Sequence, residues 1–273
     1  MMIHPLKNTT VMRELTTMKR KIVPILFLGL AVAGLLLILS SCESSDKSSD
    51  LSPQAGVGGS MARFAITGNT LYIVSKQSLE VYNITDGGSP VKAVKKNMNV
   101  GIETIFPYQS HLFIGANDGM YIYNNSNPND PQLLSKFTHV QSCDPVVVQG
   151  KYAYVTLRSG ALCRPGNTLS SLDVVDVSNP SNPAMVHSQV MSSPFGLGVS
   201  GNKLFICEGD QGFRVMDISN PILPVQKHFF AEIPSYDVIV RNKHLIITGK
   251  GGLFQYQFDQ DDKYELLSKI PVL

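Results

Sequence analysis

The sequence Phe213-Arg-Val-Met-Asp217-Ile-Ser-Asn-Pro221-Ile-Leu-Pro224 combines a short strand with a turn that closes on a proline. Its first part is a short, mainly apolar strand, and Asp, Asn and Pro are residues that favour turns. The same turn recurs at 83–90, 124–131, 176–183 and 217–224, each time with seven positions from its first Asp or Asn to its closing proline. The stretch is therefore one copy of a repeated unit.

The repeated unit has a period close to forty residues. With Leu204 as the anchor, the equivalent positions are Leu71, Leu112, Ala153 and Leu245, at spacings of 41, 41, 51 and 41 residues. A fixed period in this range is typical of β-propeller blades. Because five complete units fit, the sequence predicts an all-β fold over residues 61–273, a five-bladed β-propeller of four-stranded antiparallel blades.

Each unit contains four short segments enriched in β-branched and aromatic residues, which are typical of strands. In the first unit these segments are 63–67, 71–75, 79–83 and 91–95. Closure of a propeller removes exposed sheet edges, so we expect the first and last blades, Arg63–Lys95 and Asp237–Ile270, to touch.

The recurring turn has a local chemical explanation. An Asp or Asn side-chain oxygen can accept hydrogen bonds from backbone N–H groups two or three residues further on, and proline withholds a donor where the ladder ends. A calcium site is the alternative, but Ca²⁺ needs several oxygens in one loop, and each copy offers one or two. The pattern favours turn chemistry. Residues 259–262 of the last unit lack the prolines, as terminal repeats are often atypical.

The composition fits one globular domain that has no nucleic-acid partner. The chain has 273 residues, of which 43% are apolar and 16% are charged, enough for one sizeable core. Its net charge of +2 includes five basic residues within the first 21 positions. The rest of the chain therefore lacks the clustered basic face that nucleic-acid binding requires.

No cofactor or metal site is predicted. The sequence has no glycine-rich phosphate loop, no Gly-x-Ser-x-Gly and no His-Glu-x-x-His motif. Its four cysteines lack the Cys-x-x-Cys spacing of zinc sites. His111 and His244 each stand one residue before the anchor of their repeat, which favours a tolerated strand position over a pair of metal ligands.

The N-terminal region has the order of a secretory signal. Lys19-Arg-Lys21 precedes an apolar run from Ile22 to Leu39, which ends in Leu39-Ser-Ser-Cys42. The last four residues resemble the bacterial lipobox, and this resemblance implies that residues 1–41 are a cleaved signal peptide and that Cys42 carries a diacylglycerol. Residues 42–60 are rich in Ser, Asp and Gly and are expected to form a flexible tether. An uncleaved membrane helix is the alternative, because 18 apolar residues can span a bilayer.

The repeats themselves resemble a known family. The sequences Ser171-Leu-Asp-Val-Val-Asp176-Val-Ser-Asn-Pro180-Ser-Asn-Pro183 and Arg214-Val-Met-Asp217-Ile-Ser-Asn-Pro221 are similar to the LVIVD repeats of bacterial extracytoplasmic β-propeller lipoproteins. The likeness covers residues 62–270. It implies a propeller fold and an envelope location, here an outer membrane lipoprotein on the periplasmic face or the cell surface, and it supplies no established activity.

The third repeat carries ten extra residues within Arg158–Ser170. Insertions of this kind map to loops on one face of a repeat protein, often the binding face. Cys163 lies in this insertion and Cys143 lies in the loop that leads into the same blade, so a Cys143–Cys163 disulfide is expected in an oxidising envelope. Cys207, within an apolar strand, is expected to be a buried free thiol.

The candidate binding site is one mouth of the central channel. If the first strand of each blade lines this channel, the residues at the strand starts converge at one mouth. Loops that join second to third strands emerge at the same end of the blades, so the insertion should share this surface. The candidate binding residues are Arg63, Glu103, Asp144, Phe195, Tyr236 and Asp237.

These residues support two functional hypotheses. Arginine and two aromatic rings suit a binding module for an envelope protein, a peptide or a glycan, with the lipid anchor as the contact to the membrane. The alternative is a glycoside-acting enzyme that uses the carboxylates, because glycoside hydrolysis needs an acid and a base or nucleophile at a defined separation. We favour the non-enzymatic binding module, without any catalytic residue.

Mass spectrometry of the mature protein tests the N-terminal assignment. We expect the chain to begin at a lipidated Cys42, because several acyl chains together hold a protein stably at a membrane. A mature chain that still carries Lys19 to Leu39 would contradict the assignment.

Overall fold

The structure is a computed structural model, and it describes residues 59–98, 100–138, 145–160 and 169–272. All regular elements within these ranges are β-strands, and they form five sheets of four antiparallel strands. The strands are β1 (Phe64–Thr67), β2 (Thr70–Val74), β3 (Ser78–Asn83), β4 (Val91–Asn97), β5 (Ile102–Tyr108), β6 (His111–Ala116), β7 (Gly119–Asn124), β8 (Gln132–Phe137), β9 (Val146–Gln149), β10 (Tyr152–Leu157), β11 (Ser171–Asp176), β12 (Ala184–Val190), β13 (Leu197–Ser200), β14 (Lys203–Cys207), β15 (Phe213–Asp217), β16 (Val225–Phe230), β17 (Asp237–Arg241), β18 (His244–Gly249), β19 (Gly252–Phe258) and β20 (Tyr264–Ile270).

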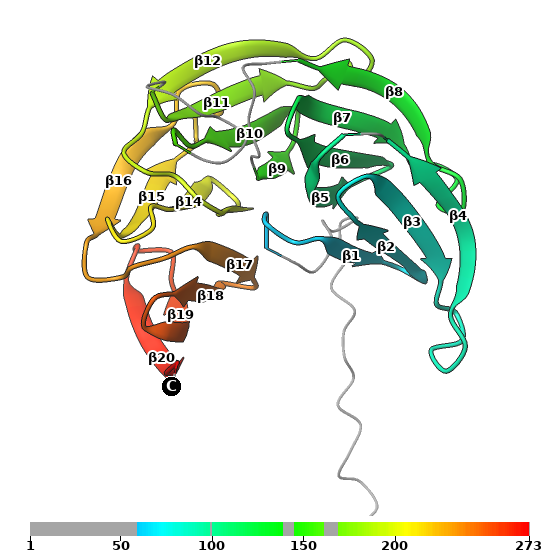
Figure 1. Cartoon of the computed structure of the whole chain (residues 1–273). Coiled ribbons are helices and arrows are strands. Elements are labelled where there is room, and N and C mark those ends of the chain that lie inside the picture. Colours follow the sequence, from blue (N-terminus) through cyan, green and yellow to red (C-terminus); the bar gives the residue numbers. More distant parts are fainter. Residues whose placement is uncertain (1–58, 99, 139–144, 161–168, 273) are drawn as a thin grey trace, which may run out of the picture. The chain divides into compact units, whose positions relative to one another are not determined.

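The predicted five-bladed propeller is confirmed. Each sheet pairs its strands in chain order, so that blade 1 is β1–β4 and blade 5 is β17–β20. Figure 1 shows the blades arranged around a centre, with the first strand of each blade innermost. The strands begin and end within a few residues of the predicted segments, because turn residues mark almost every boundary.

The core lies between consecutive blades. Three clusters of buried apolar side chains join blades 1 and 2, blades 2 to 4, and blades 4 and 5. One position of each first strand illustrates the pattern. Ile105, Val146, Leu197 and Val238 pack against the preceding blade and are no more than 1% exposed. A repeat whose two faces are both apolar is thus stabilised by its neighbours on either side.

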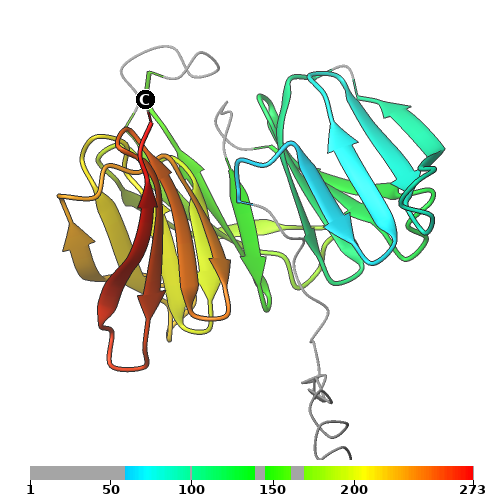
Figure 2. The same ribbon diagram turned by 90° about the horizontal axis from the view of Figure 1, so that it is seen from below.

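Blade 1 departs from this pattern because no blade packs on its free face. Phe64, the counterpart of Ile105, is 54% exposed, and Ile66 and Ile73 on the same face are also exposed. Among the described residues no core cluster spans blades 5 and 1. In Figure 1 the outer strands β4 and β20 stand apart, and in Figure 2 the cyan and red blades lie on opposite sides of this seam.

The expected contact between the first and last blades therefore needs correction. The two blades are connected through the segment Gly59–Ala62, which precedes β1, and not by packing of one sheet on the other. Ser60 Oγ in this segment donates a hydrogen bond to Asp237 at the start of β17. The face of blade 5 at the seam is also less apolar than in the other blades, since it carries Gln255 at the position of Val81, Ile122, Val174 and Val215.

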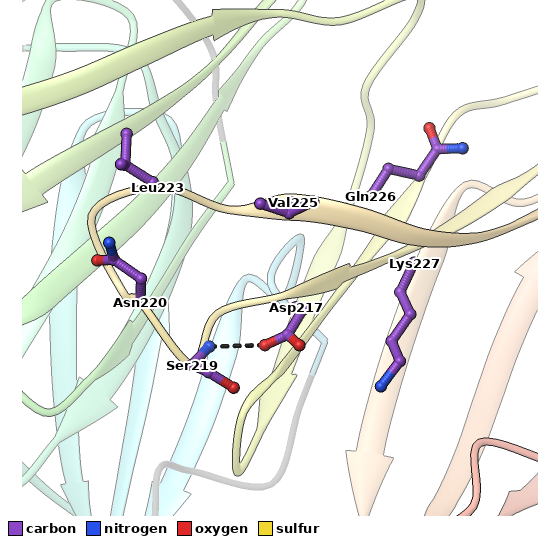
Figure 3. Close-up of a pocket in the computed structure, with 7 residues that line it drawn as sticks. All are labelled: Asp217, Ser219, Asn220, Leu223, Val225, Gln226 and Lys227. Atoms are coloured by element: carbon purple, nitrogen blue, oxygen red, sulfur yellow. Dashed lines mark hydrogen bonds between the residues drawn. The ribbon is translucent and has the colours of Figure 1, made fainter.

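The predicted turn chemistry is confirmed. The backbone N–H of Ser219 donates to Asp217 Oδ1 at 2.7 Å, as Figure 3 shows. Equivalent bonds join Ser178 to Asp176 at 2.8 Å, Ser126 to Asn124 at 2.9 Å and Thr85 to Asn83 at 2.8 Å. Hydrogen bonds from the side chain and backbone of Ser219 lower the pKa of Asp217. These side chains fix the corner between the third and fourth strands.

The same turns hold neighbouring blades together. Tyr72 Oη of blade 1 donates to Asn125 Oδ1 in the turn of blade 2 at 3.1 Å. Tyr154 Oη of blade 3 donates to the carbonyl of Pro221 in the turn of blade 4, also at 3.1 Å. Lys227 of blade 4 forms an ion pair of 2.6 Å with Asp262 in the turn of blade 5. The turns of blades 2, 4 and 5 therefore each bind to the preceding blade.

Several predictions concern residues outside the described ranges. These are the signal peptide 1–41, the lipidation site Cys42, most of the tether, and the proposed disulfide between Cys143 and Cys163. Cys207 is confirmed as a fully buried free thiol. Within the described ranges there is no helix with the length and apolar character needed to cross a membrane.

Replacing Asp217 by Ala should lower the free energy of unfolding by about 1 kcal/mol, because the Ser219 N–H loses its acceptor. The matched control is Asp217→Asn, since Asn83 and Asn124 make the same turn. Denaturant unfolding measures both. The pKa of Asp217 is lowered in the fold, so its contribution should be complete at pH 7 and should vanish as the pH falls through this lowered pKa. Equal stability of wild type and D217A at pH 7 would contradict the assignment.

Candidate functional site: the channel mouth

The segment Gly59–Ala62 crosses the predicted mouth and is called the strap here. At one end Ser60 Oγ accepts a hydrogen bond from Leu197 N at 2.6 Å and donates to Asp237 Oδ1 at 3.4 Å. At the other end the Ala62 carbonyl accepts from Ile105 N at 3.1 Å. Ser60 is 1% exposed. The strap therefore links blades 4 and 5 to blade 2 across the mouth.

Asp237 lies beneath the strap in a site shaped by two glycines. A Cβ atom at Gly59 or at Gly196 would overlap the Asp237 carboxylate, so only glycine permits this close approach. The backbone N–H groups of Met61 and Val238 and the Ser60 hydroxyl donate to the carboxylate. Burial outweighs these bonds and raises the pKa of Asp237 to about 6.

Beside Asp237 the mouth carries an aromatic cluster. The rings of Phe195 and Tyr236 meet edge to face with centroids 5.3 Å apart. The Arg158 guanidinium lies over the Phe195 ring, with Cζ 3.8 Å from its centroid. Tyr236 Oη donates to Asp210 Oδ1 at 3.2 Å. Arg158 is the first residue of the insertion. At this residue the insertion lies next to the mouth, as the sequence predicts.

The remaining predicted residues form a second group at the mouth. Arg63 and Glu103 are paired by an ion pair of 2.5 Å, and both are accessible to solvent. Arg63 directly follows the strap, whose Ala62 bonds to blade 2. Asp144 lies outside the described residues. The structure thus brings together Phe195, Tyr236 and Asp237 on one side, and Arg63 with Glu103 on the other.

Sequence reasoning missed the strap and two charged groups. Ser60 falls in the predicted tether, and its neighbours Gly59 and Met61 give no sign that its side chain is buried. Asp210 lies in the loop between β14 and β15, which was not assigned to the mouth. In the same loop Glu208 is fully buried and accepts two bonds from Arg214, one of 2.8 Å from Nη2 and one of 3.2 Å from Nε. The sequence signal that could have indicated this buried ion pair is a single glutamate directly after an apolar strand.

Two surface clefts lie away from the mouth. One of about 370 Å³ is formed by the turn after β15 and the start of β16, including Asp217, Leu223 and Lys227, and is drawn in Figure 3. The other, of about 330 Å³, lies between blades 2 and 3 and is lined in part by Tyr108 and Lys151. No group of three or more potential metal ligands occurs among the residues that the structure describes.

Comparison with known proteins identifies the repeats and the fold. The model of the LVIVD repeat matches residues 142–163, 167–190 and 196–230. No curated protein sequence is significantly similar to the chain.

Three solved structures illustrate the likeness in fold. A protein from Lactobacillus plantarum is 12% identical over 75% of this chain and 69% of its own, with a TM-score of 0.60. The periplasmic gluconolactonase PpgL from Pseudomonas aeruginosa is 12% identical over 75% and 68%, with a TM-score of 0.56. Apo AztD from Citrobacter koseri is 14% identical over 75% and 61%, with a TM-score of 0.55. At these identities the likeness concerns the fold alone, and this chain spans 61–69% of the length of the three.

Replacement of Gly196 by Ala tests the packing around Asp237. The new methyl group would also stand 2.9 Å from the Tyr236 carbonyl oxygen, so strand β13 or β17 must shift. We expect a loss of about 1–3 kcal/mol in the free energy of unfolding. The control is Gly87→Ala, since no atom lies within 4 Å of a Cβ built there. Equal free energies of unfolding for G196A and G87A would show that Gly196 does not approach Asp237 this closely.

Proposed function

We propose that this chain, a five-bladed propeller that carries LVIVD repeats, is a non-enzymatic binding module held at the bacterial envelope by a lipid on Cys42. Its ligand is a peptide or glycan, free or part of an envelope protein, and it meets the channel mouth. The observation that carries this proposal is the cluster of Phe195, Tyr236 and Arg158, half-buried side chains contributed by different blades.

The chemistry of this cluster suits recognition. The Phe195 and Tyr236 rings offer apolar area at a small cost in side-chain entropy, and the Arg158 guanidinium packs on the Phe195 ring and fixes its position. The Asp210 carboxylate accepts a hydrogen bond from the Tyr236 hydroxyl, and this bond fixes the orientation of the ring. A few polar and aromatic groups on rigid strands are typical of sites for sugars and peptides.

The glycoside-acting alternative is supported less well by the carboxylates. Glu103 is paired with Arg63, and the Asp237 carboxylate accepts bonds from the strap that covers it. A glycosidase needs one carboxyl group that protonates the leaving group and a second that activates water or attacks the sugar. Asp210, the third described carboxylate at the mouth, accepts a hydrogen bond from the Tyr236 hydroxyl. All three are thus engaged by the chain itself, which favours binding over hydrolysis.

The envelope location rests on the N-terminal pattern. Basic residues, an apolar run and Leu39-Ser-Ser-Cys42 stand in the order of a lipoprotein signal, and polar residues follow. A tether of this composition would hold the propeller away from the bilayer surface and leave the mouth accessible.

The test is a panel of envelope glycans and peptides presented to the purified full-length chain. Replacing Phe195 by Ala should weaken binding of any captured ligand at least tenfold, about 1.4 kcal/mol, because Arg158 and Tyr236 lose the ring that positions them. The matched control is Phe229→Ala on the outer strand β16, because the Phe229 ring also packs under an arginine, Arg214, but lies away from the mouth.

Two outcomes would contradict the proposal. Ligand binding that is equally strong in F195A and wild type would place the site elsewhere. Turnover of a polysaccharide that disappears in Glu103→Gln or Asp237→Asn would support the glycosidase instead.

A further inference from the structure

The cleft between blades 2 and 3 lies where a contact made by other blades is missing. Tyr72 of blade 1 and Tyr154 of blade 3 directly follow the anchors of their repeats, and each hydroxyl donates to the turn of the next blade. Blade 2 has Phe113 at this position, which carries no hydroxyl. Phe113 and Val177, in the turn of blade 3, both line the cleft of about 330 Å³.

Blade 2 binds the turn of blade 3 further out. Ser135 Oγ on the outer strand β8 donates to the Pro180 carbonyl at 2.6 Å. In blade 4, which has Phe205 at the position of Phe113, ion pairs to Asp262 hold the turn of the next blade. The interface between blades 2 and 3 is therefore closed at its outer edge and open further in.

The cleft has an apolar floor and a polar rim. Its floor includes Phe113, Val148 and Val177, which are at most 7% exposed. Four polar side chains of the lining come from the hairpins β5–β6 and β9–β10, neighbours in Figure 1, and they are Tyr108, Gln109, His111 and Lys151. A concave site of this size with a few polar groups around apolar side chains is typical of small-molecule binding.

The polar groups of the rim are available to a ligand. Within the part of the chain that the structure describes, the side chains of Gln109, His111 and Lys151 have no hydrogen-bond or ion-pair partner. Tyr108 Oη accepts from Gly150 N at 2.8 Å, so its own hydrogen can be donated to a further acceptor. Burial lowers the pKa of His111, and its neutral ring presents one N–H donor.

The charge at the rim favours an anion. Lys151 is exposed, and it is the charged residue among the described residues that line the cleft. The neighbouring carboxylate of Asp176 accepts a hydrogen bond from Ser178 N at 2.8 Å. Hydrogen bonds from Ser178, together with the charge of Lys151, lower the pKa of Asp176. An anion thus meets an unpaired ammonium group, whereas a cation meets no carboxylate in the lining.

We propose that this cleft is a second binding site, which takes a small organic carboxylate with an apolar body. The carboxylate lies at the rim, where the Lys151 ammonium and the Tyr108 hydroxyl donate to it, and the apolar body covers Phe113 on the floor. The site is separate from the channel mouth. Glu103 at the mouth and Tyr108 at the cleft stand near opposite ends of β5, about 17 Å apart along the strand.

NMR titration of the full chain with 3-phenylpropionate tests this site. We expect binding in the millimolar range, as is typical of a ligand of this size, and a shift of the Gly150 amide signal, because its acceptor Tyr108 contacts the ligand. Lys151→Gln should weaken binding about fivefold, since an exposed ammonium contributes this much to an ion pair. The matched control is Lys243→Gln, which changes the lysine at the same hairpin position of blade 5 and should bind as wild type does.

A second variant tests the shape of the cleft. Phe113→Tyr introduces the hydroxyl that Tyr72 and Tyr154 direct to the next turn, and this group should occupy the floor and weaken binding of 3-phenylpropionate. If this variant does not fold, Lys151→Gln still decides the matter, because Lys151 is exposed. The uncharged 3-phenylpropionamide should bind more weakly than the acid to wild type.

Three results would overturn the proposal. These are an unchanged Gly150 signal at the highest soluble concentration of 3-phenylpropionate, equal affinities for the acid and its amide, and equal affinities of K151Q and wild type. A short peptide that ends in phenylalanine distinguishes the sources of the carboxylate. Tighter binding of this peptide than of 3-phenylpropionate assigns the site to protein C-termini, and weaker binding assigns it to free acids.

Discussion

The structure depends on the burial of apolar side chains between consecutive sheets. A single four-stranded blade cannot cover its own apolar faces, so each blade is stabilised by packing on at least one neighbour. Ile114 of blade 2 and Ile247 of blade 5 are fully buried by this packing, while Ile73 at the equivalent position of blade 1 is exposed. The difference shows that burial is set by the neighbouring blade and not by the residue type. It also makes the ends of the array the places where other interactions must act.

The repeated turn contributes to this packing in two ways. Its Asp or Asn side chain satisfies a backbone N–H and fixes the corner between the third and fourth strands, as at Asp217 and Ser219. The residues that follow then reach the preceding blade, as Asn125 and the Pro221 carbonyl do. A motif that looks purely local in sequence therefore also fixes the spacing of blades. The turn of the fifth blade also contacts the preceding blade, but through a different residue, since Asp262 forms ion pairs with Lys203 and Lys227 of blade 4.

The mouth combines groups of two kinds. Phe195, Tyr236 and Arg158 are partly exposed side chains that pack on one another at the mouth. Asp237 belongs to the internal support of the mouth, since the strap and two glycines enclose it. The buried Glu208–Arg214 pair stabilises the loop that carries Asp210. A carboxylate near a channel is thus not in itself a catalytic group, and its partners decide what it can do.

The sequence alone determined the number of blades, the four strands in each and the chemistry of the turns. These features depend on local rules, namely the enrichment of β-branched and aromatic residues in the strands, the spacing of anchors such as Leu204, and the Asp, Asn and Pro residues at the corners. It also indicated that Phe195, Tyr236 and Asp237 lie at one mouth, because the repeat aligns them. Only the tertiary structure decided how the ring is closed and what surrounds Asp237. Ser60 lies 177 residues from Asp237, and its contact arises from the way five blades curve around a common centre. Such curvature is a property of all the interfaces together, and no single repeat encodes it.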